Sequence, residues 1–179
     1  YYKGINTINT QETARNALAS VSQSAQLDAG TPKSGSASFG NPATPNTFVV
    51  VQSRCIGNTR FSFVKNLRVT DGVSIDKGQR QIRHALWQDS TNDSSCPAAD
   101  LTNDDPSLSG GVSGSGRELL GANMRLRDFD VALSSNGAIG IKIGVIYGDN
   151  DLVEETSPDE AVGCLGGVVG PQWCASSYL

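Results

Sequence analysis

The residues best suited to covalent chemistry in this sequence are its four cysteines, Cys55, Cys96, Cys164 and Cys174. No two of them have the Cys-x-x-Cys spacing of a zinc site or of a thioredoxin-like redox centre. An even number of cysteines is instead typical of disulfides in an oxidising compartment. Three pairings are possible, and we favour Cys164–Cys174, which closes a short glycine-rich loop, with Cys55–Cys96 by elimination. Four buried free thiols in a cytosolic protein are the alternative.

A Ser-His-Asp triad would have to use His84, because it is the single histidine of the chain. This residue lies between apolar neighbours in a predicted strand. The stretch closest to a nucleophile elbow, Gly111-Val-Ser-Gly-Ser115, has serine where the final glycine belongs. The same stretch lacks the Lys-Ser/Thr ending of a phosphate-binding loop. We therefore predict an ordinary sheet histidine and a protein that is not an enzyme.

Three carboxylates of an acidic run, Asp149, Asp151 and Glu154, are candidate calcium ligands. Ca²⁺ takes about six to eight hard oxygen ligands, often from one loop. The spacing of these residues does not match an EF-hand, and a solvated acidic loop is the alternative interpretation. Apart from this candidate calcium site, the sequence predicts no cofactor.

Composition and charge limit the class of protein. The 179 residues are enough for one domain with a real core, and 20 glycines with 37% hydrophobic content favour a loop-rich β or α+β domain. The net charge of −4 provides no basic field for nucleic acid. The sequence contains no run of roughly 18 apolar residues, so it predicts no transmembrane helix. Because the chain begins at Tyr1 and not at Met, we expect a processed or trimmed product.

The strongest local pattern predicts a β-hairpin. Residues 138–147 alternate large apolar groups with small or polar ones, and Ser134-Ser-Asn-Gly137 provides the turn before them. The partner strand, Met124–Leu133, changes phase near Arg127, which predicts a β-bulge. This hairpin is expected to form the centre of a sheet.

Other patterns predict the surrounding strands and loops. A second hairpin is predicted over 47–65, beginning with the apolar run Phe48–Val51, which indicates a strand buried on both faces. One strand is predicted over Arg80–Trp87, and a long surface loop over 88–116. Residues 29–46 are rich in glycine, serine, proline and threonine, which predicts a linking loop with a short strand at Ser36–Phe39.

A helix is predicted over residues 5–27. Its apolar residues step by four, three and four, which indicates a narrow packing face of mostly small side chains that can lie close against a sheet. This predicted packing face consists of Ala14, Leu18, Val21 and Ala25.

This order of parts resembles the soluble domain of a type IV pilin or pseudopilin. Four local stretches are similar to segments of the PulJ/PilW-like prepilin group. They are Cys55-Ile-Gly-Asn-Thr-Arg-Phe61, Ala85-Leu-Trp-Gln-Asp89, Val145-Ile-Tyr-Gly-Asp-Asn-Asp-Leu152 and the ending Cys164-Leu-Gly-Gly…Gln-Trp-Cys-Ala-Ser-Ser177.

The resemblance implies an α+β, pilin-like fold with an N-terminal amphipathic helix on an antiparallel β-sheet, long loops and a C-terminal disulfide-bounded loop. One domain would cover 1–179, with the C-terminal half of the pilin helix at 1–28, a linking loop at 29–46 and the sheet domain at 47–179. The apolar half of that helix, which anchors the precursor in the membrane, would precede Tyr1.

The implied function is that of a minor pilin, a structural subunit of a type IV pilus or a secretion pseudopilus outside the cell. Its partners would be other pilin subunits in a filament or tip complex, and a host or neighbouring cell surface. A secreted β-rich adhesin or carbohydrate-binding module is the alternative function, and a secreted hydrolase is a third class that the single histidine disfavours.

Overall fold

The computed structural model describes residues 2–27, 30–40, 48–75, 80–108, 115–157, 160–164 and 174–178. These residues form one α-helix, α1 (Tyr2–Leu27), and twelve strands. The strands are β1 (Lys33–Phe39), β2 (Val49–Ile56), β3 (Thr59–Phe63), β4 (Val73–Ile75), β5 (Arg80–Ile82), β6 (Leu86–Ser90), β7 (Arg117–Glu118), β8 (Met124–Leu133), β9 (Ile139–Gly148), β10 (Val153–Ser157), β11 (Glu160–Cys164) and β12 (Cys174–Tyr178). Two 3₁₀ turns, η3 (Pro106–Leu108) and η4 (Asn150–Leu152), complete the described elements.

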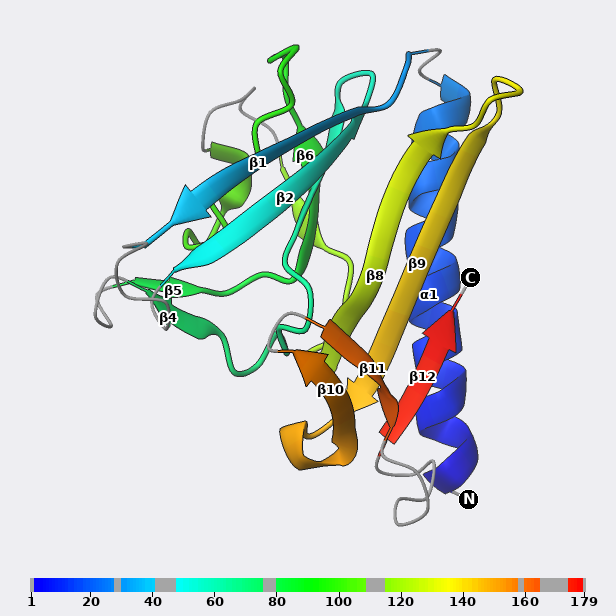
Figure 1. Cartoon of the computed structure of the whole chain (residues 1–179), viewed down its shortest axis with the longest axis vertical. Coiled ribbons are helices and arrows are strands. Elements are labelled where there is room, and N and C mark those ends of the chain that lie inside the picture. Colours follow the sequence, from blue (N-terminus) through cyan, green and yellow to red (C-terminus); the bar gives the residue numbers. More distant parts are fainter. Residues whose placement is uncertain are drawn as a thin grey trace.

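The strands form four separate antiparallel sheets. The largest has five strands in the order β1-β2-β3-β6-β7, and the next has three strands in the order β12-β9-β8. Two further hairpins, β4–β5 and β10–β11, form sheets of two strands each. Figure 1 shows the five-stranded sheet on one side of the molecule and the three-stranded sheet on the other, with α1 lying along the three-stranded sheet.

The β8–β9 hairpin agrees with the sequence pattern. Gly137 in its turn has φ of +83°, a conformation that glycine adopts without strain. The pairing register shifts between Leu126 and Asp128, so the predicted β-bulge is confirmed. Ile143 and Val145 of β9 are fully buried, as the alternation requires.

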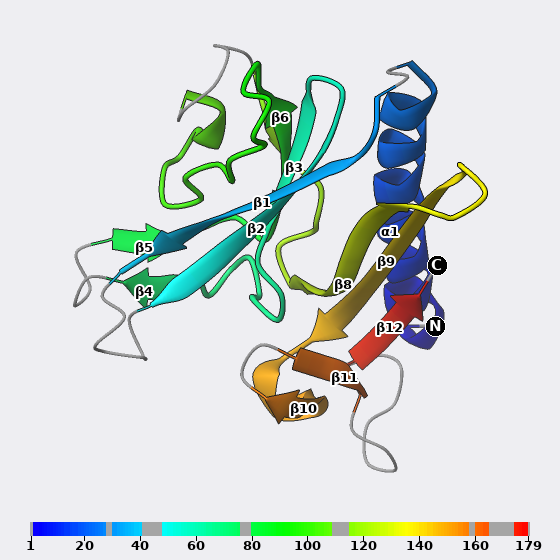
Figure 2. The same cartoon turned by 45° about the horizontal axis from the view of Figure 1, so that its top comes forward.

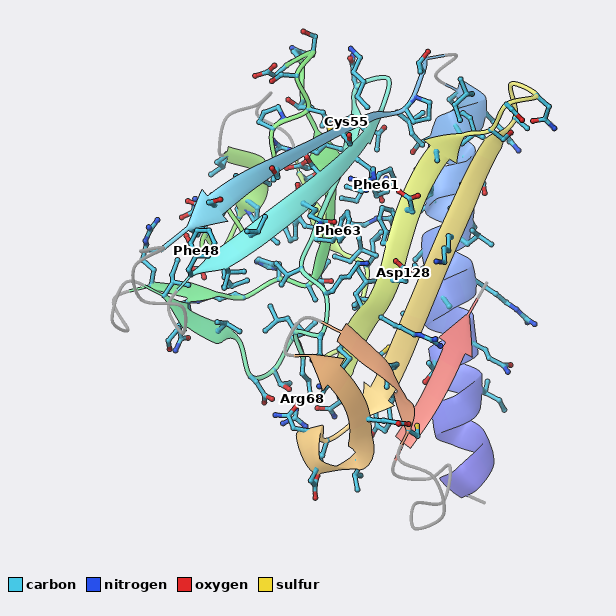
Figure 3. All side chains as sticks on the ribbon, viewed as in Figure 1. Phe48, Cys55, Phe61, Phe63, Arg68 and Asp128 are labelled. Atoms are coloured by element: carbon cyan, nitrogen blue, oxygen red, sulfur yellow. A yellow bond between two sulfur atoms is a disulfide. The ribbon has the colours of Figure 1, made fainter. Side chains whose placement is uncertain are left out.

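Two hydrophobic cores lie on opposite faces of the five-stranded sheet. The main core joins α1, β3, β8 and β9, and in it Phe61 and Phe63 of β3 pack against Phe129 of β8 with ring centroids 5.8 and 5.1 Å apart. Figure 3 shows Phe61 and Phe63 in the space between the two larger sheets. The second core contains Val51, Val64, Leu67, Ile75, Ile82, Trp87, Ala99 and Leu101.

The predicted fold class, an α+β domain with a helix on one antiparallel sheet, is wrong. The described residues form a single helix and twelve strands divided among four sheets, so the fold is β-rich. The helix does pack on a sheet, but that sheet has three strands and the larger one lies beyond it. Alternating patterns predict strands without saying which strands pair, so the division into separate sheets was not visible in the sequence.

The single strand predicted over Arg80–Trp87 is also wrong. It is two strands, β5 and β6, because the backbone N–H of Arg83 leaves the ladder and donates to the carbonyl of Leu101 at 2.9 Å. The N–H groups of Ala85 and Leu86 donate instead to the carboxylate of Glu118, each at 3.0 Å. These three hydrogen bonds replace strand pairing between the two segments.

Two other strand predictions need correction. The run Phe48–Val51 is not buried on both faces, because Val50 is 43% exposed and β2 has one covered face. The predicted linking loop 29–46 contains a full seven-residue strand, β1, in place of the short strand expected at Ser36–Phe39. Serine, glycine and alanine give β1 no apolar alternation by which it could be recognised.

Candidate functional site: the helix and the loop 91–108

Helix α1 lies along the three-stranded sheet, against β9 and β12 (Figures 1 and 2). Of the predicted packing face, Ala14 and Val21 are fully buried, and Leu18 and Ala25 are partly buried against the main core. Sequence reasoning missed Ala17, which is 1% exposed. Small residues on this face let the helix axis approach the sheet closely.

The buried face of α1 also carries hydroxyl groups, so the two faces of the helix differ less in polarity. Thr10, Ser20 and Ser24 are all buried. The Ser24 hydroxyl donates to the carbonyl of Ser20 one turn earlier, at 3.1 Å, which satisfies it inside the helix. These residues are why α1 is less amphipathic than predicted.

A polar contact ties α1 to the five-stranded sheet. The Ser20 hydroxyl donates to Gln88 Oε1 of β6 at 2.7 Å. The guanidinium of Arg117 donates to the Ser20 hydroxyl at 2.9 Å and to the same Gln88 oxygen at 3.1 Å. The helix is therefore fixed to both larger sheets. Its outer surface carries Ile8, which is 59% exposed, and Leu27 at its C-terminal end, which is 76% exposed.

The second candidate surface is the loop 91–108, which lies over β2, β3 and β6 on the side away from α1 (Figure 1). A disulfide joins Cys55 of β2 to Cys96 of this loop, and both cysteines are buried. The Ser53 hydroxyl donates to the carbonyl of Cys96 at 2.6 Å, and the N–H of Ala99 donates to the Ser62 hydroxyl at 2.9 Å. The loop is thus attached to the sheet by a covalent bond and by buried polar contacts.

A buried ion pair supports the same loop. Arg60 of β3 donates two hydrogen bonds to Asp89 of β6, at 2.8 and 2.7 Å, and both side chains are fully buried. A further N–H of Arg60 donates to the carbonyl of Pro97 at 3.0 Å. Sequence reasoning missed this pair, because strand alternation placed Phe61 and Phe63 on one face and indicated nothing about what covers Arg60 on the other.

Three Asp-x-Ser/Thr turns order the loop 91–108 locally. In each turn the aspartate carboxylate accepts hydrogen bonds from the backbone N–H and the hydroxyl of the residue two positions later. The pairs are Asp93 with Ser95, Asp100 with Thr102, and Asp105 with Ser107. The pKa of Asp93 lies below its usual value because the backbone N–H of Ser95, and then its hydroxyl, stabilise the carboxylate. The repeated spacing is visible in the sequence and could have indicated an ordered loop.

The candidate calcium ligands are not brought together. Asp149 forms an ion pair with Arg68, whose guanidinium also binds Asp71 at 2.7 Å. Asp71 therefore has a lowered pKa, chiefly through its hydrogen bond with Arg68. Asp151 and Glu154 are exposed. Within the described ranges, no group of three or more His, Cys, Asp or Glu side chains could hold a metal ion. Figure 3 shows Arg68 beside β10, near the start of β8.

His84 lies between β5 and β6, where its ring packs against Trp87 with centroids 4.5 Å apart. Its Nδ1 is 3.5 Å from the carboxylate of Glu118, and its Nε2 is buried without a hydrogen-bond partner. The same carboxylate already accepts the N–H groups of Ala85, Leu86 and Leu120. These contacts give His84 a structural position in the fold.

A polar cavity of about 300 Å³ opens at the edge of β6. Its lining residues are Thr59, Gln88, Asp89, Ser90, Ser115, Gly116 and Arg117. The two charged groups there already have partners, because Asp89 binds Arg60 and Arg117 binds Gln88 and Ser20. This cavity was not anticipated from the sequence.

The remaining predicted residues belong to the C-terminal region. Cys164 is disulfide-bonded, whereas the side chain of Cys174 and the loop 165–173 lie outside the described residues. Across the part of the chain that the structure describes, no helix combines the length and the apolar character needed to cross a bilayer. Comparison with protein-family models, with curated proteins and with solved structures found no match to this chain.

Proposed function

We propose that this chain is a structural minor pilin subunit, part of a type IV pilus or a secretion pseudopilus, and not an enzyme. The observation that carries the proposal is the division of α1 into two surfaces. Small residues such as Ala14 and Ala17 fix one face to the chain's own sheet, and the other face of this 26-residue helix is exposed between Ile8 and Leu27. An N-terminal helix of this length, half covered by its own domain, is suited to pack against helices of neighbouring subunits.

The exposed face of α1 offers a specific contact point. Ile8 is 59% exposed, although its neighbours on that face, Asn9, Glu12 and Arg15, are polar or charged and also exposed. Covering a large apolar side chain in this setting with a second helix lowers the free energy, because apolar surface is removed from water. The partners in this proposal are other pilin subunits, and the proposal rests on the helix and the local sequence resemblance, independently of the sheet arrangement.

The loop 91–108 supports a location outside the cell. A disulfide such as Cys55–Cys96 persists in oxidising compartments. The loop lies on the far side of the five-stranded sheet from α1 (Figures 1 and 2), so helix packing in a filament would leave it free to contact a surface. Its Leu108 is 68% exposed.

Burial of four aromatic rings among the described residues favours this function over a carbohydrate-binding module. Binding of sugars by stacking needs exposed aromatic rings. Phe61, Phe63, Phe129 and Trp87 are all buried in the two cores. Among the described residues, the large apolar side chains with high exposure are Ile8, Leu27, Val50, Leu108 and Leu133, which are all aliphatic.

The test is made on the natural full-length protein in its own cells. We expect Ile8→Asp to remove the protein from filaments sheared off the cell surface while it remains in the membrane fraction. Gln23→Asp, an exposed change on the same helix, is the matched control and should leave assembly intact. Purified domains carrying either change should melt at the wild-type temperature. Normal recovery of the Ile8→Asp protein in sheared filaments would contradict the proposal, and so would a mature protein, identified by intact mass, that begins near Tyr1 without an apolar helix.

A further inference from the structure

Strand β1 forms an outer edge of the five-stranded sheet. All seven of its residues pair with β2 in one continuous register, from Lys33 opposite Cys55 to Phe39 opposite Val49. Over the described ranges, no strand lies along its other side, and no other segment hydrogen-bonds to its backbone. An edge strand carries a row of outward-facing N–H and C=O groups that can template another strand.

Three other sheet edges in the described structure are short, partly covered or charged. Strand β7 has two residues. The start of β8 is covered by the segment 66–70, in which Asn66 N–H donates to the carbonyl of Leu126 at 2.8 Å and Val69 N–H to that of Met124 at 3.3 Å. Strand β10 carries adjacent glutamates. The edge of β1 differs from these three.

The sequence of β1 lacks the usual protection of an edge. Natural edges are protected by lysine, proline, a bulge or a covering loop. The run from Ser34 to Phe39 contains no charge and no proline, and its pairing with β2 shows no register shift. Ser34, Ser36 and Ser38 are exposed on one face, whereas Gly35, Ala37 and Phe39 are partly covered on the other.

We propose that β1 is a dimerisation edge, at which two copies of this chain pair their β1 strands antiparallel about a two-fold axis at Ser36. The pairing joins two five-stranded sheets into one continuous sheet. It goes beyond the filament function, because it uses an edge of the five-stranded sheet and not the exposed face of α1.

The strand is complementary to itself in this register. A two-fold axis at Ser36 pairs Ser36 with its own copy and Ser34 with Ser38, so that hydroxyl groups oppose hydroxyl groups across the interface. The single charge, Lys33, lies opposite the ring of Phe39, where a cation–π contact is favourable. No like charges face each other. The two halves of β1 therefore complement each other. Binding of a foreign peptide would not require this complementarity, so it favours a second copy of the chain as the partner.

The dimer is expected to be weak in solution. A single pair of seven-residue strands buries less than the roughly 1,200–2,000 Å² typical of stable interfaces. Copies held near each other on a surface would pair more readily, because tethering raises their effective concentration. Detection in solution therefore requires a high protein concentration.

The first test is sedimentation of the purified protein over a wide concentration range. We expect a monomer–dimer equilibrium that Ser36→Lys weakens by about tenfold or more, because it places two lysines opposite each other at the axis. Gln52→Lys is the matched control, since Gln52 is exposed on β2 directly beside Ser36. It adds the same charge one strand further from the axis and should change the dimer little. A monomer at every concentration, or a dimer that Ser36→Lys leaves unchanged, would overturn the proposal.

Cross-linking tests the register. Under oxidising conditions Ser36→Cys should form a covalent dimer, whereas Ser34→Cys should not cross-link to itself but should cross-link to Ser38→Cys in a mixture. Equal cross-linking of all single variants, or of none, would overturn the proposed axis. The Ile8→Asp variant should keep the β1 dimer, so failure of the filament proposal and failure of this one are separate outcomes.

Discussion

Arg60 and Asp89 form a two-point ion pair that no solvent reaches. The two N···O distances are 2.8 and 2.7 Å, and both side chains are fully buried between the sheet and the loop 91–108. A buried ion pair is a weak argument for stability in itself, but the loss of one partner leaves the other charge unpaired in the interior.

We therefore expect Asp89→Ala to lower the free energy of unfolding by about 3–5 kcal/mol, measured by urea denaturation. A double variant, Arg60→Met with Asp89→Leu, should recover most of this loss because it removes both charges. Asp104→Ala is the control, since its ion pair with Arg83 is exposed, and it should change stability by at most about 1 kcal/mol. A similar loss of stability in Asp89→Ala and Asp104→Ala would show that burial does not determine how much the ion pair of Arg60 and Asp89 contributes.

Removal of the Cys55–Cys96 disulfide should also destabilise the protein. The two cysteines are 41 residues apart, so cross-linking restricts the unfolded chain by about 4 kcal/mol in the loop-entropy description. We expect a variant with alanine at both positions to lose roughly this amount and to keep α1 docked, because the main core lies on the other face of the sheet. Thermal melts with circular dichroism at the helical band would test both expectations. A loss below about 1 kcal/mol would indicate that the polar anchors alone hold the loop.

Gly35 should tolerate no side chain. A Cβ atom at this position of β1 would overlap the carbonyl of Cys96, which lies directly over it and accepts the Ser53 hydroxyl. We expect Gly35→Ala to lower stability by about 1–3 kcal/mol through displacement of the loop. Gly140→Ala in β9 is the control, because its nearest contact would be an ordinary 3.8 Å. Equal effects of the two changes in chemical denaturation would contradict this explanation.

The docking of α1 can be tested at Val21. This residue is fully buried in the main core, and Val21→Asp places a carboxylate there without a partner. We expect a loss of about 3 kcal/mol or more and a clear fall in melting temperature. Gln23→Asp introduces the same group on the exposed side of the helix and should melt near the wild-type temperature. An unchanged melting temperature for Val21→Asp would mean that the helix does not dock on this sheet.

Much of the local structure could be predicted because apolar side chains alternate clearly. The β8–β9 hairpin, its bulge near Arg127 and the β2–β3 hairpin all follow from the positions of isoleucine, valine and phenylalanine. The helix was recognised from the spacing of Ala14, Leu18, Val21 and Ala25, although its upstream start at Tyr2 was not.

What could not be predicted depended on segments distant in sequence. Strand β1 carries serine, glycine and alanine, which have no strand signal until β2 pairs with them. The buried pair of Arg60 and Asp89 was missed because nothing in the sequence shows that the loop 91–108 covers Arg60. The β10–β11 hairpin lies in an acidic stretch that resembles a loop. The assignment of strands to four sheets could not be predicted for the same reason, because the partner of each strand depends on the fold of the whole chain.

Asp128 gives the stability of the fold a defined dependence on pH. Its carboxylate lies at the bulge of β8, 3.0 Å from Lys65 Nζ and in an ion pair with Lys142 (Figure 3). Burial is the largest single influence and raises the pKa of this carboxyl, but the two lysines together outweigh it, so that its pKa lies below the usual value of about 3.9. A carboxyl with a lowered pKa contributes stability that is present above its unfolded pKa and is lost as the pH falls through its folded pKa.

We expect Asp128→Asn to be less stable than wild type near pH 6, with the difference shrinking as the pH falls below about 4 and vanishing once wild-type Asp128 is protonated. Other acidic groups with lowered pKa values, such as Asp71 and Asp93, titrate in both proteins and largely cancel from the difference. Urea denaturation of both proteins between about pH 2 and pH 6 would measure it. A difference that stays constant across this range would mean that Asp128 stabilises β8 through packing or neutral hydrogen bonds, and not through its charge.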